Sequence, residues 1–142
     1  MNEKDMDMNI ERCEPRYGPT NPSPGNQKAS GVMRFGSIIG LKPEKEEYYR
    51  ELHAEVWPGV IDRLRKSNVS NYSIHLVEIE GKKYLVSYLE YTGKDYQADM
   101  DRIAADPETR RWWKETDPCQ FSLDPDESGI KWNPMEMVFW ME

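Results

Sequence analysis

The sequence predicts an α+β protein with the ferredoxin-like, split βαβ arrangement, in which helices cover one face of an antiparallel sheet. Alternating apolar residues mark the candidate strands, and apolar residues at helical spacing mark the helices. The predicted order is strand, helix, strand, strand, helix, strand. Because one face of such a sheet stays uncovered by helices, we expect a ligand or a second subunit there.

Strands are predicted where apolar and polar or small residues alternate. The first covers residues 33–41, and residues 71–79 and 84–91 form a hairpin joined by a short glycine turn. A polar loop is predicted over residues 117–133. The last strand is expected at residues 136–141, in which Met137, Phe139 and Met141 share one face.

Helices are predicted in the two segments between the strands. The first follows Pro43, with apolar residues at every fourth position up to Leu64. Pro58 removes a backbone donor and clashes with the preceding turn, so we expect it to kink or split this helix. A second helix covers residues 94–105, and Asp106-Pro107 is the N-cap and first position of a third.

Two regions of the chain differ in composition. Residues 1–31 are predicted to be a flexible N-terminal extension, because the stretch 14–25 has no hydrophobic period and is rich in proline and glycine. An arm that wraps a neighbouring subunit is the alternative. Residues 32–142 are expected to form one folded domain, since a chain of 142 residues is too short for two of ordinary size.

Composition excludes several classes of function. A net charge of -7 argues against binding to nucleic acid or to an anionic membrane. No apolar run is long enough to span a bilayer, and no signal peptide is evident, so a cytoplasmic protein is expected. The two cysteines, Cys13 and Cys119, are predicted to be free thiols, because no CxxC motif or disulfide framework is present.

His53 is the first candidate for chemistry. It follows Tyr49 by four residues, so both side chains project from the apolar side of the first helix, toward the sheet. Histidine can give or take a proton near neutral pH; a structural histidine is the alternative. His75 is predicted to face solvent, on the opposite side of its strand from Tyr72. The two histidines form no metal-binding pattern, so no metal site is predicted.

Aromatic residues are the second candidate feature. The neighbouring Trp112 and Trp113 point about 100° apart on a helix, so both seldom serve one core. Flat aromatic faces stack on the C–H faces of sugars, and the Tyr72 phenol can bond a hydroxyl group. The alternatives are one core and one rim tryptophan, and a half-exposed strand tyrosine. No phosphate loop, nucleotide fingerprint or serine-nucleophile elbow occurs, so no cofactor is predicted.

From about Met33 to Glu142, the chain resembles the L-rhamnose mutarotase family. Each matching motif is weak alone, but the set occurs in the family's order and with similar spacing. The motifs are Tyr49-Arg50-Glu51-Leu52-His53, Val56-Trp57-Pro58, Asn71-Tyr72-Ser73-Ile74, Arg111-Trp112-Trp113-Lys114 and Met137-Val138-Phe139.

The resemblance implies a homodimeric α/β barrel built from ferredoxin-like units. It also implies cofactor-free interconversion of the α and β anomers of L-rhamnose, a small neutral monosaccharide. His53 matches the family's proton donor, while Tyr49, Tyr72, Trp112 and Trp113 match its sugar-binding positions. Three alternatives stay open: a mutarotase for L-fucose or another 6-deoxy sugar, a non-catalytic sugar-binding dimer, and a cofactor-free oxygenase on a similar dimeric barrel.

Overall fold

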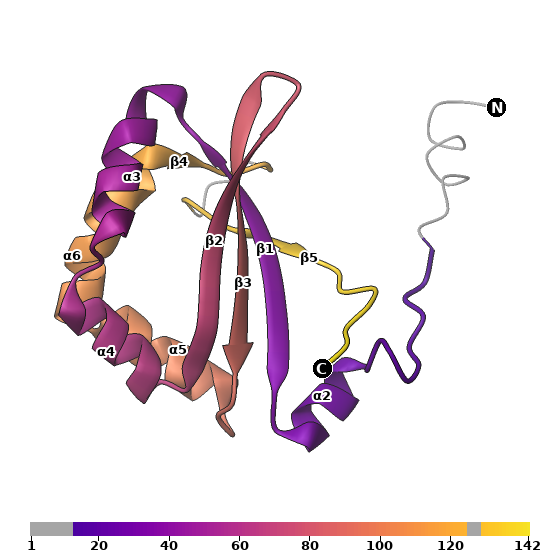
Figure 1. The fold of residues 1–142 in the computed structure, drawn as a ribbon. Helices are drawn as coiled ribbons and strands as arrows, with labels where there is room; N and C mark the ends of the chain where they lie inside the picture. Colours follow the sequence, from indigo (N-terminus) through magenta and orange to yellow (C-terminus); the bar gives the residue numbers. More distant parts are fainter. Residues whose placement is uncertain (1–12, 125–128) are drawn as a thin grey trace.

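The computed structural model describes residues 13–124 and 129–142, which form one antiparallel sheet and the helices around it (Figure 1). The strand order is β2-β3-β1-β4, and β5 also pairs with β1. The elements are α2 (Pro24–Ser30), β1 (Met33–Leu41), η1 (Pro43–Lys45), α3 (Glu46–Ala54), α4 (Pro58–Lys66), β2 (Val69–Ile79), β3 (Lys82–Tyr91), α5 (Tyr96–Ala105), α6 (Pro107–Thr116), η2 (Asp117–Cys119), β4 (Gln120–Phe121) and β5 (Asn133–Met135).

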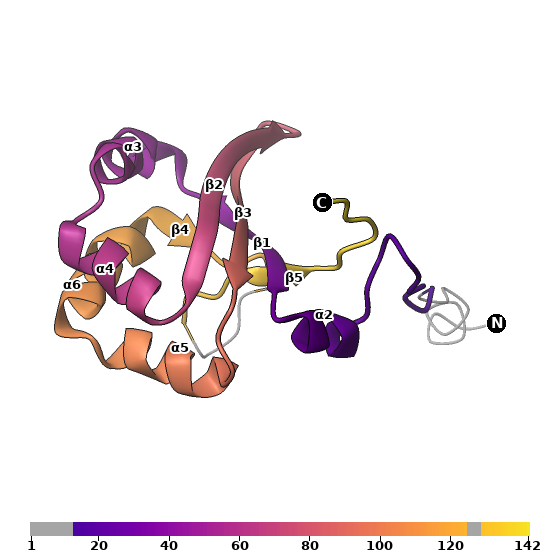
Figure 2. The same cartoon turned by 60° about the horizontal axis from the view of Figure 1, so that its bottom comes forward.

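The topology is the predicted split βαβ. Strand β3 is antiparallel to both β1 and β2 and lies between them, so β1 and β2 run parallel. Figures 1 and 2 show α3, α4, α5 and α6 in an arc along one side of the sheet, with α2 and the C-terminal tail on the other. The side toward the arc is called the inner face below, and the other side the outer face. The predicted fold class is confirmed.

Several predicted boundaries are confirmed by the local chemistry. The helix after Pro43 is split, with α3 ending at Ala54 and α4 starting at Pro58, because proline is tolerated only in the first turn. Asp106 caps α6, accepting a hydrogen bond from the Thr109 N–H at 2.9 Å.

The prediction of a last strand at residues 136–141 is wrong. The place of the fourth strand beside β1 is divided between β4 and β5, which pair with different parts of β1. Beyond Met135 the backbone leaves the sheet, and the Trp140 N–H donates to the Thr20 carbonyl at 2.8 Å. The Arg34 guanidinium lies 3.6 Å from the centre of the Trp140 ring. The apolar residues of this segment therefore belong to a tail bound to the N-terminal segment.

The N-terminal segment contains a helix, α2, that was not predicted from the sequence. Ser23 caps α2 by accepting from the Asn26 N–H at 3.1 Å, and Gly31 ends it in the left-handed conformation at φ 88°. The buried Gln27 side chain accepts from the Arg34 N–H at 2.8 Å, which ties α2 to β1. The first twelve residues of the predicted flexible extension lie outside the described part of the chain. The domain boundary at residue 31 stays a prediction.

The core lies on the inner face of the sheet. Ile39, Leu41 and Leu85 are buried there together with Tyr49 from α3 and Cys119 from η2. Apolar burial of this kind is the main source of folding free energy. Cys13 is exposed and Cys119 is buried, and neither forms a disulfide, as predicted. Among the helices of the described residues, none has the length and apolar character needed to span a membrane.

Glycine in β1 allows close packing on the outer face. Gly40 pairs with Phe121 in β4, and a Cβ atom added at Gly40 would lie 2.2 Å from the Phe121 ring. The ring therefore rests directly on the β1 backbone and fixes β4 against it. At Gly36 the nearest atom to an added Cβ would be the Met135 Cε at 3.1 Å, the end of a flexible side chain.

The Gly40→Ala substitution is expected to destabilise the fold by about 1–3 kcal/mol, because the new methyl group must displace a packed ring. The measurement is equilibrium unfolding in urea. Gly36→Ala is the matched control, with a smaller loss expected since Met135 can move. Equal stability of Gly40→Ala and wild type would show that Phe121 does not hold β4 in place.

Candidate active site

The imidazole of His53 stacks on the ring of Tyr49 at the C-terminal end of α3. The ring centroids are 4.0 Å apart and the planes differ by 22°. His53 Nδ1 lies 2.9 Å from the Tyr49 carbonyl oxygen. A carbonyl can only accept, so Nδ1 carries the hydrogen and donates it. Nε2 is then the nitrogen left to exchange a proton with a ligand.

Burial keeps the His53 ring neutral. Desolvation lowers the pKa of His53 below the ordinary 6.5, and the hydrogen bond to the Tyr49 carbonyl opposes this shift without cancelling it. Since the folded-state pKa is lowered, the neutral ring stabilises the fold above about pH 6.5, and this contribution is lost as the pH falls. At neutral pH the Nε2 lone pair is therefore free to accept a proton.

Tyr49 is almost fully buried, at 4% exposure. Burial is the main cause that raises the pKa of its phenol far above the ordinary 10. The Gln120 Nε2 group donates to the Tyr49 hydroxyl oxygen at 3.4 Å. The phenol therefore stays protonated at any physiological pH. It can donate a hydrogen bond, but it cannot act as a base.

One tryptophan holds the imidazole from the side, and a second tryptophan packs behind the first. Trp112 of α6 is buried, and its ring meets the His53 ring edge-on with centroids 5.2 Å apart. Trp57, at the start of α4, meets Trp112 edge-on at 5.1 Å. Such edge-to-face pairs are a preferred geometry for aromatic rings. Side chains from α3 and α6 thus contact the His53 ring, and Trp57 supports Trp112.

Tyr72 lies at an irregularity of β2. The pairing of β2 with β3 shifts register between Ser70 and Ser73, and Asn71 has φ 48°. The Tyr72 side chain is 42% exposed, yet desolvation raises the pKa of its phenol. A charge on Tyr72 would raise the pKa of Tyr49, so the two phenols are within electrostatic range of each other. Tyr72 therefore approaches the site from the sheet.

The structure brings most of the predicted site residues together. Contacts join Tyr49, His53 and Trp112. Trp113, one position further along α6, is 39% exposed and takes no part in the ring contacts of the described residues. Its predicted sugar-binding role stays a prediction.

Two residues near the site were not predicted from the sequence. Gln120 bonds Tyr49, and Trp132 packs against the core cluster that contains Tyr49. Both fall in the segment interpreted as a polar loop, which has no hydrophobic period. Their positions follow from the pairing of β4 and β5 with β1, a long-range contact that local sequence does not reveal.

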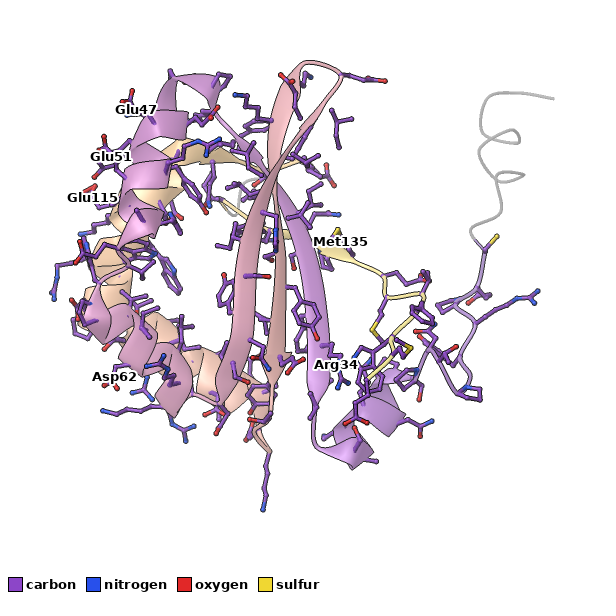
Figure 3. All side chains as sticks on the ribbon, in the orientation of Figure 1. Arg34, Glu47, Glu51, Asp62, Glu115 and Met135 are labelled. Atoms are coloured by element: carbon purple, nitrogen blue, oxygen red, sulfur yellow. The ribbon has the colours of Figure 1, made fainter. Side chains whose placement is uncertain are left out.

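His75 and the acidic residues of α3 and α6 labelled in Figure 3 lie away from the cluster of Tyr49, His53 and Trp112. His75 is exposed and bonds its neighbour Ser73 at 3.1 Å, which confirms the predicted solvent-facing position. Figure 3 shows Glu47, Glu51 and Glu115 on the side of α3 and α6 away from the sheet. The described residues contain no group of His, Cys, Asp and Glu suited to hold a metal ion.

Comparison with known proteins identifies the family of this chain. A family model described as L-rhamnose mutarotase matches residues 34–141. The chain belongs to the L-rhamnose mutarotase family. The family match spans every candidate site residue and starts after α2, so this helix lies outside it.

Relatives of the family agree over the same part of the chain. An L-rhamnose mutarotase from Lactiplantibacillus plantarum is 32% identical over 78% of this chain and 100% of its own. One from Listeria monocytogenes is 32% identical over 76% of this chain and 98% of its own. The crystal structure of L-rhamnose mutarotase from Formosa agariphila aligns with a TM-score of 0.58 and 25% identity, covering 78% of this chain and 99% of that one. The family and the fold predicted from the sequence are confirmed.

The state of His53 can be tested by NMR. We expect its ring to titrate with a midpoint below 6.5, because burial disfavours the imidazolium. Above the midpoint, two-bond ¹H–¹⁵N spectra should show the tautomer with hydrogen on Nδ1. A His75→Gln variant assigns the signals. A midpoint at or above 6.5, or hydrogen on Nε2 of the neutral ring, would contradict the geometry described.

Proposed function

We propose that this protein is a carbohydrate epimerase-type enzyme that interconverts the α and β anomers of L-rhamnose. One observation carries the proposal: a member of this family holds a neutral His53 with a free Nε2 against Tyr49 and Trp112. An aromatic pocket with a few polar groups suits a small uncharged sugar. Trp112 and Trp113 are proposed as the stacking wall, and Tyr49 and Tyr72 as hydrogen-bonding partners of the sugar hydroxyls.

The chemistry requires proton transfers only. Opening the sugar ring removes the proton of the anomeric hydroxyl, breaks the bond from C1 to the ring oxygen and protonates that oxygen. Rotation about the next C–C bond and closure give the other anomer. No electrons are gained or lost, so the proposed reaction needs no cofactor. Positioned acid–base groups accelerate such steps by about 100- to 10,000-fold.

His53 is proposed as the proton-transfer residue, acting through Nε2. The resting ring is neutral, so it first accepts the proton of the anomeric hydroxyl. The imidazolium so formed is the proton donor to the ring oxygen, the role expected from the sequence. Both sugar oxygens are bonded to the same carbon, which lets one nitrogen serve both in turn. On closure the same steps run in reverse.

A homodimer is proposed to form through the outer face of the sheet. Val77 and Ile79 of β2 are 38% and 48% exposed, and Met135 on β5 is 39% exposed. The register places Val77 opposite Tyr84, which in turn pairs with Gly40, so these side chains share the outer face. In the tail, Val138 and Phe139 are 74% and 61% exposed. Exposed apolar residues gathered on one side of a molecule are typical of contact sites. The cytoplasmic location expected from the sequence stays a prediction.

The function is tested by replacing His53. We expect His53→Asn to slow anomer exchange of L-rhamnose by about 100-fold or more, since the proton-transfer group is lost. Saturation-transfer NMR between the two anomers measures the exchange, with L-fucose tested in parallel. Similar exchange of both sugars would broaden the substrate to 6-deoxy sugars in general.

His75→Asn is the matched control, because this exposed histidine lies on the outer face, and full activity is expected. Sugar binding by wild type without accelerated exchange would identify a non-catalytic binding protein. Oxygen uptake in place of anomer exchange would indicate an oxygenase. Unchanged exchange in His53→Asn would remove His53 from the mechanism.

The dimer is tested by charge placed on the outer face. Light scattering after size exclusion should give twice the 16.7 kDa chain mass for wild type. Val77→Glu is expected to shift the protein toward the monomer, because a charge would be buried in the contact. Glu47→Lys, on the helix side away from the sheet, is the control. A dimer unaffected by Val77→Glu would place the interface elsewhere.

A further inference from the structure

Gln120 lies on β4, and its side chain contacts Tyr49 but has no role in the mechanism proposed above. Its side chain is 4% exposed, and its Nε2 group donates to the Tyr49 hydroxyl oxygen at 3.4 Å. We propose that Gln120 is a positioning residue, which turns the Tyr49 O–H toward the sugar. This inference rests on the proposed function, because it assigns Tyr49 a role in the same reaction.

Gln120 is placed by pairing with β1 that is independent of Tyr49. In the register of β4, Gln120 lies opposite Leu41 and Phe121 lies opposite Gly40. Neighbouring strand residues point to opposite faces. Phe121 packs on the Gly40 backbone at the outer face, so Gln120 must point to the inner face. The Lys42 N–H also donates to the Cys119 carbonyl at 2.8 Å, which fixes the start of β4.

The direction of the hydrogen bond decides what Tyr49 can do. A phenol oxygen that accepts from Gln120 keeps its own hydrogen for another acceptor. Donation from Gln120 also favours the phenolate, but burial outweighs it, and the phenol stays protonated. Tyr49 therefore offers a neutral donor beside the His53 ring. The 3.4 Å separation is long for such a bond, and contacts of this kind commonly shorten when substrate binds.

This donor fits the oxygen on which negative charge develops. His53 Nε2 takes the hydrogen of the anomeric hydroxyl, and the electron pair of that O–H bond becomes the C1=O bond as C1 releases the ring oxygen. The bonding pair leaves with the ring oxygen, which then receives the proton from Nε2. A hydrogen bond from Tyr49 stabilises the oxygen charge before this second transfer, at no cost in reorganisation.

Apolar packing alone does not explain why a glutamine is buried at position 120. An amide without partners in this position would cost free energy, whereas a leucine or methionine would extend the Ile39, Leu41 and Leu85 core. The polar side chain therefore has its use in the bond to Tyr49. A carboxylate at the same place would accept the phenol's hydrogen and turn it away from the sugar.

The test is a double-mutant cycle on anomer exchange of L-rhamnose. Gln120→Met keeps the side-chain length and removes the donor, and we expect kcat to fall about tenfold with KM little changed, as for one lost hydrogen bond. In the Tyr49→Phe background, Gln120→Met should have no further effect, because the hydroxyl group through which Gln120 acts is gone. Gln120→Glu, a second variant of nearly the same shape, should lose more than Gln120→Met.

Controls separate positioning from folding and from the proposed function. Gln97→Met, an exposed glutamine on α5, should match wild type. A loss that is equally large in the Tyr49→Phe background would make Gln120 merely structural and overturn the inference. If wild type binds L-rhamnose without accelerating exchange, the proposed function fails alone, and the same cycle is run on the Kd from calorimetry. The inference would also be overturned if Gln120→Met and Tyr49→Phe changed the Kd independently of each other, or if the protein bound no sugar at all.

Discussion

The hydrogen bond from His53 Nδ1 to the Tyr49 carbonyl is the interaction on which the site depends. It assigns one ring nitrogen to the backbone and leaves Nε2 for the ligand. A lone bond would let the ring swing, but the Tyr49 ring below it and the Trp112 edge beside it limit that motion. The orientation of one imidazole thus requires α3 and α6 to meet on the inner face. The fold contributes to the chemistry by bringing these helices together.

The sequence predicted those parts of the structure that depend on nearby residues. The four-residue spacing of Tyr49 and His53, the split at Pro58 and the Asp106 cap all follow from contacts within one or two turns. The strand predicted at residues 136–141 failed because its backbone bonds to Thr20, at the other end of the chain. Gln120 was not predicted as a site residue because its position also depends on long-range contacts, with Leu41 and Tyr49. Tyr72 and Trp113 were proposed as sugar-binding residues because of a family resemblance, since spacing alone left each of them ambiguous.

Strand β1 links the two faces of the molecule. Its inner side chains, Ile39 and Leu41, close the core below the site, while its outer side has glycine where Phe121 and Met135 approach. Small residues on one face allow β4 and β5 to share the place of a single strand. That division brings Gln120 to Tyr49 and Trp132 to the core cluster that contains Tyr49. An unbroken fourth strand at residues 136–141 would have left both in a connecting loop.

The charges of the chain and the chemistry of the site are kept apart. The labelled acidic residues Glu47, Glu51 and Glu115 face outward (Figure 3), whereas burial holds His53 neutral and Tyr49 protonated. A buried carboxylate would be costly unless paired, and it would hold an imidazolium too tightly to release its proton. Anomer exchange already proceeds unaided, so in the proposed mechanism a neutral imidazole and a neutral phenol supply enough acid–base help without that cost. The uncharged surroundings of His53 are therefore consistent with the proposed uncharged substrate, and with the proposed mechanism, in which the proton must leave His53 as readily as it arrives.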